Sequence, residues 1–121
     1  MWRNLFFVFI GGGVGSVLRS LIARWVTLIN FPLATFLVNV VGCFLIGLFY
    51  ALFARQLMGS DWRLLLTVGF CGGFTTFSTF SNEGFHFLRS GQFLLFGGYV
   101  IASLACCLLA VWFGDLVGRN L

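Results

Sequence analysis

The sequence predicts an all-α integral membrane protein of four transmembrane helices, with a break in the third. Of its 121 residues, 60% are hydrophobic and only 8% are charged, whereas soluble domains carry about 25% charged residues. The apolar residues also fill four long runs with short polar segments between them, and a helix needs about 20 such residues to cross the hydrocarbon. We expect a single four-helix domain over residues 1–121.

The first span is expected from about Leu5 to Leu28. A turn at Asn30–Pro32 follows, because proline disfavours helix in the residue before it and suits a helix start. The remaining spans, separated by polar segments at Arg55–Arg63 and Arg89–Gln92, are about Leu33–Phe53, Leu64–Leu88 and Phe93–Trp112. The N-terminal run lacks a clear small-residue cleavage site, so we interpret it as a helix rather than a signal peptide.

The seven basic residues are all arginines, and they are not clustered as a nucleic-acid site would require. With four spans, both termini and the second loop share one side. That side holds Arg3, Arg55, Arg63 and Arg119, and the other holds Arg24 and Arg89. This weak bias is compatible with a cytoplasmic position of both termini and with insertion in both orientations.

Small residues in the first two spans indicate close helix packing. They form the patterns Gly11-x-x-x-Gly15 and Gly12-x-x-x-Ser16 in the first span, with Gly42 and Gly47 in the second. Contacts within one subunit and contacts between two subunits both explain the patterns. We interpret the four cysteines as small apolar packing residues, since all lie within apolar runs: Cys43, Cys71, Cys106 and Cys107.

Polar side chains inside membrane spans are costly and are candidates for function. Arg24 can extend its head to the interface, as long basic side chains do. Arg19 lies deeper, and a structural anchor, a vestibule charge and a direct role in transport remain open. Asn39 in the second span either bridges two helices or donates to a permeating anion.

The third span carries the strongest functional signal. Tandem glycines at Gly72 and Gly73 precede five hydroxyl residues between Thr75 and Ser81. Broken backbone at membrane depth is tolerated inside protein or beside a water-filled cavity. Channels and transporters use such breaks to aim carbonyls at cations and amides at anions.

Phe77 and Phe80 lie near one face of this span, among the hydroxyl residues. They either pack in lipid or present their positive ring edges to a small anion. Glu83 is expected to be the one acid within a span, and it would serve a proton-coupled carrier. No role is assigned to His86. Tyr99, Ser103 and Cys107 share a face of the last span, either as a polar seam or as a helix contact.

The third-span sequence from Gly72 to Ser81, GGFTTFSTFS, closely resembles the signature of the Fluc (CrcB) fluoride channels. Further support comes from the run Gly11–Gly15 with Arg19 and from Thr35 with Val38, Asn39 and Gly42. The resemblance extends over the whole chain. It departs from the usual pattern at Ser20, Ala34 and Cys107, which leaves details of the polar track open.

The resemblance implies an antiparallel, dual-topology homodimer with two fluoride pores in a bacterial plasma (inner) membrane. It implies a structural Na⁺ at the dimer axis, held by backbone carbonyls of Gly72 and Thr75 from both subunits. Phe77 and Phe80 would contact fluoride by their ring edges, and Arg19 would line a vestibule. The matching polar pore positions are Asn39, Ser78, Thr79, Ser81, Glu83, Tyr99 and Ser103.

The function so implied is passive, fluoride-selective export that gives fluoride resistance, without an enzymatic step. An inside-negative potential drives an anion outward, and the chain contains no P-loop for ATP. One alternative is a proton-coupled exporter similar to the small multidrug resistance family, but that family relies on an acid in its first helix, where this chain has Arg19. A membrane subunit without transport activity is the second alternative, although the short loops offer it little surface.

Overall fold

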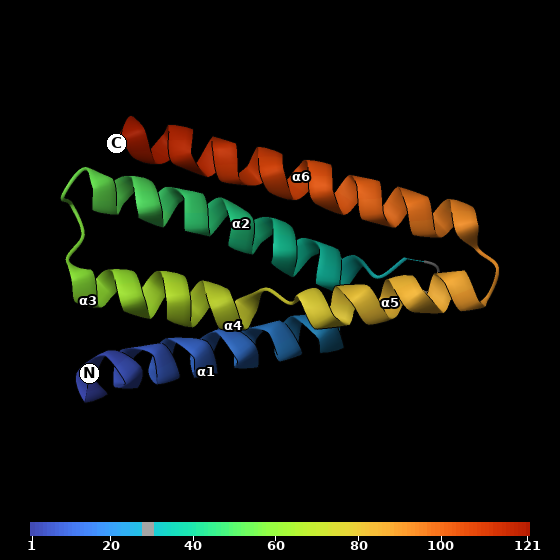
Figure 1. The fold of residues 1–121 in the computed structure, drawn as a ribbon, viewed down its shortest axis with the longest axis horizontal. Helices are drawn as coiled ribbons and strands as arrows, with labels where there is room; N and C mark the ends of the chain where they lie inside the picture. The colour runs from blue at the N-terminus through green and yellow to red at the C-terminus, as the bar shows by residue number, and fades with distance from the viewer. Residues whose placement is uncertain (28–30) are drawn as a thin grey trace.

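The computed structural model describes residues 1–27 and 31–121, and these form helices joined by short connections (Figure 1). The elements are α1 (Trp2–Trp25), α2 (Leu33–Ala54), α3 (Ser60–Arg63), the π-helix η1 (Leu64–Cys71), α4 (Gly72–Phe74), α5 (Phe77–Arg89) and α6 (Phe93–Arg119). Within the described ranges, four helical stretches are long and apolar enough to span a membrane: α1, α2, the series from α3 to α5, and α6. The prediction of four spans with a break in the third is confirmed.

The span boundaries differ from the predicted ones at several ends. Helix α1 already ends at Trp25, while the expected end at Leu28 and the turn residue Asn30 lie outside the described residues. Helix α6 continues past Trp112 to Arg119, where an i,i+4 ion pair of 2.8 Å between Arg119 and Asp115 suits a turn in contact with water. Asp115 therefore belongs to helix α6 but lies beyond the predicted end of the fourth span, in its polar last turns.

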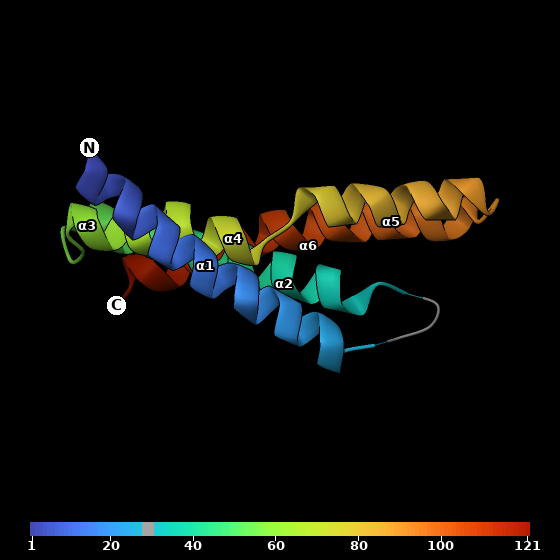
Figure 2. The ribbon, with the colours of Figure 1, turned by 90° about the horizontal axis from the view of Figure 1, so that it is seen from below.

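The elements pack in two groups. Helix α2 packs along α6, which also contacts α5, and α1 packs against η1 and α4. Figure 2 shows α1 diverging from α5 and α6 towards its C-terminal end. Both termini lie at the same end of the molecule as the connection from α2 to α3, as four spans require (Figure 1).

Glycines allow the close contact between α1 and the third span. A Cβ atom at Gly11 would overlap the backbone carbonyl of Leu65, and one at Gly15 would overlap that of Phe70. The Gly11-x-x-x-Gly15 pattern thus serves packing within one subunit, which was one of the two explanations left open by the sequence.

Polar contacts tie the elements together at the end that holds the termini. Arg3 forms a 2.5 Å ion pair with Asp61 at the start of α3. Arg55 follows α2 and donates to the carbonyl of Gly118 at 3.0 Å and to that of Leu121. Since terminal carbonyls of a helix have no partners within it, Arg55 acts as a cap for α6.

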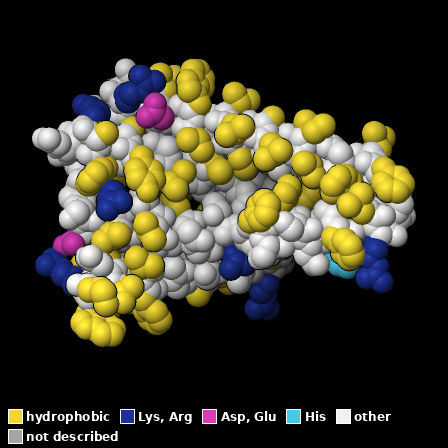
Figure 3. All heavy atoms as spheres, viewed as in Figure 1, with side chains coloured by type: hydrophobic (Ala, Val, Ile, Leu, Met, Phe, Trp, Pro, Cys, Tyr) yellow, Lys and Arg dark blue, Asp and Glu magenta, His cyan; other side chains and the backbone are white. Residues whose placement is uncertain are grey.

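The surface is largely apolar, and fully buried side chains are few. Hydrophobic side chains spread over the face in Figure 3, and many arginine and acidic side chains gather at the end with the termini. Large exposed side chains such as Phe9, Leu94 and Leu108 project from several helices. An apolar surface of this extent suits lipid or a neighbouring helix rather than water.

Candidate ion path at the break in the third span

The third span is interrupted at two threonines, not at the tandem glycines. Gly72 and Gly73 remain helical in α4, whereas Thr75 (ψ 158°) and Thr76 (φ −150°, ψ 114°) are extended. The break lies in the predicted stretch, among its hydroxyl residues rather than at the tandem glycines. Gly73 instead allows close approach, since a Cβ atom there would overlap the carbonyl of Gly12 on α1.

Asn39 of α2 holds the extended segment by two hydrogen bonds. The backbone N–H of Thr76 donates to Asn39 Oδ1 at 2.7 Å, and Asn39 Nδ2 donates to the Thr76 carbonyl at 3.2 Å. One side chain therefore replaces the bonds that a continuous helix would give this residue. Of the two roles open to Asn39, the bridge between helices is the one the structure shows, and one N–H of its amide stays available beyond the bridge.

Thr76 begins the second half of the span as an N-cap. Its Oγ1 accepts a hydrogen bond from the Thr79 N–H at 3.2 Å, which satisfies a donor that has no carbonyl partner at a helix start. The Thr79 hydroxyl lies 3.1 Å from the same atom and the Ser78 hydroxyl 3.4 Å from it. Three hydroxyl groups thus meet at the start of α5.

These side-chain hydrogen bonds leave two backbone carbonyls without their helical donors. In a continuous helix the Thr76 N–H would bond the Gly72 carbonyl, and the Thr79 N–H would bond the Thr75 carbonyl. Both N–H groups have the side-chain partners given above, so the carbonyls of Gly72 and Thr75 lose these donors. The carbonyls expected to hold Na⁺ are therefore among those that the break frees, and Gly72 is exposed on the surface of the chain.

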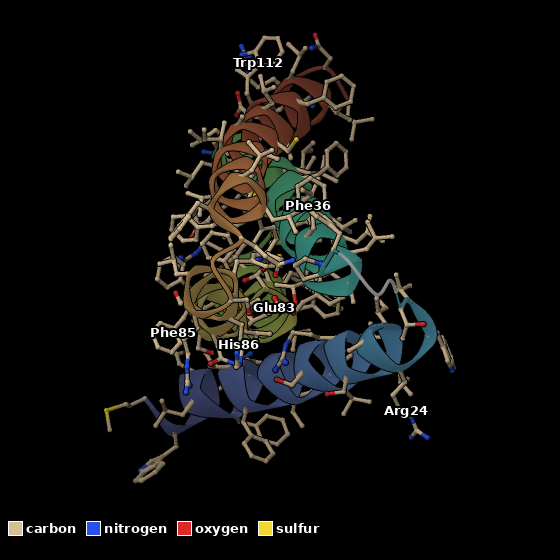
Figure 4. All side chains as sticks on the ribbon, turned by 90° about the vertical axis from the view of Figure 1, so that its right-hand side faces the viewer. Arg24, Phe36, Glu83, Phe85, His86 and Trp112 are labelled. Carbon is tan, nitrogen blue, oxygen red and sulfur yellow. The ribbon has the colours of Figure 1, made fainter. Side chains whose placement is uncertain are left out.

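Arg19 stabilises the end of α4 from α1. Its Nε donates to the Gly73 carbonyl at 3.1 Å, and Ser16 Oγ lies 3.5 Å from the same oxygen. A cation near helix-terminal carbonyls is electrostatically favourable. Of the roles left open for Arg19, this contact matches a structural anchor. Arg24 projects away from the helices at the end of α1, as expected for an interfacial side chain (Figure 4).

A hollow of about 480 Å³ opens beside the break. It is lined by Asn39, Gly42, Cys43, Ile46, Tyr50, Thr67, Val68, Cys71, Gly72, Thr75, Thr76, Phe77, Phe80, Ser103, Leu104 and Cys107. Arginine, histidine and acidic residues are absent from this lining, as far as the structure describes the chain. Ser103 is 6% exposed, and its Oγ has no hydrogen-bond partner among the described residues. Since buried hydroxyls are nearly always paired, a guest in the hollow is the natural partner for Ser103.

An aromatic cluster continues from the hollow towards the other end of α5. Tyr99 is fully buried, and its ring lies 5.0 Å from that of Phe80 and 5.4 Å, edge to face, from that of Phe31. The Tyr99 hydroxyl donates to Glu83 Oε1 at 3.0 Å. Figure 4 shows Glu83 between the helices rather than on the outer face. Glu83 is thus held by α6.

The structure brings most of the sequence-predicted site residues to the break or to the Tyr99 cluster. Asn39, Thr79, Phe80 and Ser103 belong to this inner set, together with Glu83 and Tyr99. Phe77 edges the hollow but is 77% exposed, and its ring centroid lies 5.7 Å from that of Phe80. Ser78 and Ser81 are exposed on α5, and Ser78 reaches the inner set only through its contact with the Thr76 hydroxyl.

Three residues of the site, Thr76, Phe31 and Cys43, are not among those predicted from the sequence. Thr76 could have been found as an N-cap, since threonine favours the position before a helix start. Cys43 follows Asn39 by one helical turn, which places both residues on one face. Phe31 had no usable signal, because its contact with Tyr99 joins distant parts of the chain.

The fold and this site define a multi-pass membrane protein whose third span is opened beside a mostly apolar hollow that a few uncharged polar residues line. The sequence model of the family described as "CrcB-like protein, Camphor Resistance (CrcB)" matches residues 6–115. The chain belongs to this family, and the predicted resemblance is confirmed.

Curated relatives match nearly the whole chain. A protein of Phocaeicola vulgatus is 49% identical over 115 residues, covering 93% of this chain and 95% of its own. A protein of Bacteroides fragilis is 44% identical, with 98% of each chain covered, and one of Coxiella burnetii is 37% identical, with 98% and 99% covered. Each is named "Fluoride-specific ion channel FluC". This family is one of ion channels, which confirms the prediction that the chain is not an enzyme.

Proposed function

We propose that this chain is the subunit of a fluoride-selective channel, and that fluoride passes along the hollow beside the Thr75–Thr76 break. The observation that carries the proposal is the unpartnered Ser103 hydroxyl in a hollow whose lining is uncharged and mostly apolar. The names of the relatives supply the identity of the ion.

Selectivity for a small anion follows from the kind of groups that face it. The hydroxyls of Ser103 and Thr76, and the free N–H of Asn39, are donors that replace water around fluoride. The edges of the Phe77 and Phe80 rings carry partial positive charge and add to these donors. A lining without a full cation binds the anion weakly enough for release, as conduction requires.

The proposed assembly is an antiparallel, dual-topology homodimer with two pores. The exposed Gly72 and the open side of the hollow support it, since one chain leaves the path uncovered. A Na⁺ ion fits the carbonyls of Gly72 and Thr75, because both have lost their helical donors and hard cations prefer oxygen ligands. Its contribution would be electrostatic neutralisation of carbonyl dipoles at the subunit contact.

The proposed direction of flow is outward across a bacterial plasma membrane. An inside-negative potential moves a monovalent anion outward with about 2.3 kcal/mol per 100 mV. This driving force is sufficient for export, and it would give the cell fluoride resistance without coupling to ATP or protons.

Fluoride efflux from liposomes that contain the purified protein tests the function. We expect fluoride to leave and chloride to be retained, and Phe80→Ile to slow the fluoride flux by about tenfold or more, equivalent to about 1.4 kcal/mol of lost interaction. Phe9→Ile is the matched control, because Phe9 is 76% exposed on α1, away from the break. Equal chloride flux, or no fluoride flux from folded protein, would refute the proposal. Proton movement driven by substrate and dependent on Glu83 would favour a carrier instead.

A further inference from the structure

Two cysteines face one another where α2 and α6 pack. The two helices run in the same direction (Figure 1), and they touch at Gly47, where a Cβ atom would overlap the carbonyl of Val111. Parallel helices keep their register from turn to turn. One turn earlier on each helix, Cys43 therefore lies opposite Cys107.

Both thiols belong to the hollow that holds the candidate ion path. Cys43 and Cys107 are part of its lining, together with Ser103, one turn before Cys107 on α6. Both cysteines are free and partly accessible, and the buried Ser103 hydroxyl has no partner within the described chain. The unpaired hydroxyl is a second indication, independent of the thiols, that this place accepts a guest.

The neighbouring thiol of Cys106 faces elsewhere. It lines a separate apolar hollow with Val40, Leu109 and Phe113. Consecutive residues of a helix point about 100° apart, so adjacent cysteines on α6 serve different surfaces. The interpretation of all four cysteines as packing residues therefore misses a difference: Cys43 and Cys107 line the hollow beside the break, and Cys106 lines the separate apolar one.

The pair defines which ligands are suitable. Within residues 1–27 and 31–121, no three His, Cys, Asp or Glu side chains come together as a metal site. Zinc requires four ligands at a structural site, so this pair of thiols does not suit it. Soft cations that prefer thiolates and accept two of them in a line, such as Hg²⁺, Ag⁺ and Cu⁺, match the pair.

We propose that Cys43 and Cys107 form a two-thiolate site for a soft, thiophilic cation, and that a cation bound there blocks the ion path. With Hg²⁺, each thiol loses its proton, two S–Hg bonds form and two protons are released, with no transfer of electrons. The bound metal occupies the hollow beside Ser103, where it displaces the permeating anion. The block rests on the proposed channel function, whereas the metal site does not.

Mercuric chloride added to liposomes with the wild-type channel is the probe. We expect loss of fluoride efflux, reversed by a dithiol that removes the metal. Cys43→Ser and Cys107→Ser, each compared with its own rate before addition, should resist the block. Cys106→Ser, which changes the adjacent thiol, and Cys71→Ser should remain sensitive, and Zn²⁺ should leave the wild type active. A block that persists in Cys43→Ser and Cys107→Ser, or one that Cys106→Ser or Cys71→Ser abolishes, would overturn the assignment.

Intact-mass spectrometry of purified protein separates the site from the channel function. A bridged metal adds one mercury atom, removes two protons and carries no added thiol, and Cys107→Ser should lack this species. If the wild type forms it but passes no fluoride, the metal site stands and the channel function fails. If the wild type passes fluoride without forming it, the site alone is refuted. Cys43→Ala and Cys107→Ala repeat both measurements if a serine variant does not fold.

Discussion

Replacing Asn39 by alanine tests the hydrogen-bonded bridge that holds the break open. The variant removes the 2.7 Å bond from the Thr76 N–H and the 3.2 Å bond to the Thr76 carbonyl. Single hydrogen bonds contribute about 0.5–1.5 kcal/mol, and bonds between transmembrane helices average about 0.6 kcal/mol. Two such bonds, with both backbone groups left beside a hollow that admits water, give a loss of about 2 kcal/mol in the free energy of unfolding.

Two measurements follow from this loss. Unfolding in mixed micelles should show the lower stability, and exchange of the Thr76 amide hydrogen should accelerate roughly 30-fold if local opening becomes easier by the same free energy. Fluoride efflux should fall as well, because Thr76 also orders the hydroxyls at the start of α5.

Asn120→Ala is the matched control. Its Nδ2 makes one exposed hydrogen bond, to the Leu116 carbonyl at 2.7 Å, and exposed contacts of this kind change stability by less than about 0.5 kcal/mol. If Asn39→Ala unfolds like the wild type and its Thr76 amide stays protected, Asn39 does not hold the break and the reasoning fails.

Two further predictions concern the contacts around the site. Gly15→Ala should destabilise the chain by about 1–3 kcal/mol, because the added methyl group overlaps the Phe70 carbonyl, whereas Gly13→Ala enters open space and should be neutral or slightly stabilising in the same unfolding experiment. Tyr99→Phe should cost about 1–3 kcal/mol, since it removes the 3.0 Å hydrogen bond to Glu83. Unchanged stability of Tyr99→Phe would mean that this bond contributes nothing.

Much of the fold was predictable because hydrophobicity along the chain limits it strongly. The long apolar runs predict the four spans, and the run Arg89–Gln92 lies where α5 ends and α6 begins. Helix ends were less accurate. An apolar run marks the part of a helix that lies in the hydrocarbon. Helix α6 continues beyond that part to Arg119 through a polar turn, which hydrophobicity does not predict.

The candidate site was predictable as a list of residues and much less so as an arrangement. Hydroxyl-rich sequence at membrane depth pointed to the third span, because polar groups there need partners. The sequence did not show that Gly72 and Gly73 stay helical, that η1 is a π-helix, or that the break falls at Thr75–Thr76. The bond from Asn39 on another helix accounts for the position of the break, and a local pattern cannot display such a partner.

The sequence by itself determined the class of the protein, the number of its spans and the stretch where the third span opens. These properties depend on hydrophobicity and on local chain chemistry, both of which can be read along one chain. Only the tertiary structure decided which carbonyls are freed, that Ser103 lacks a partner and that Cys43 faces Cys107 while Cys106 does not. Each of these depends on the register between helices far apart in sequence, which the packing of backbones at Gly11, Gly15 and Gly47 sets.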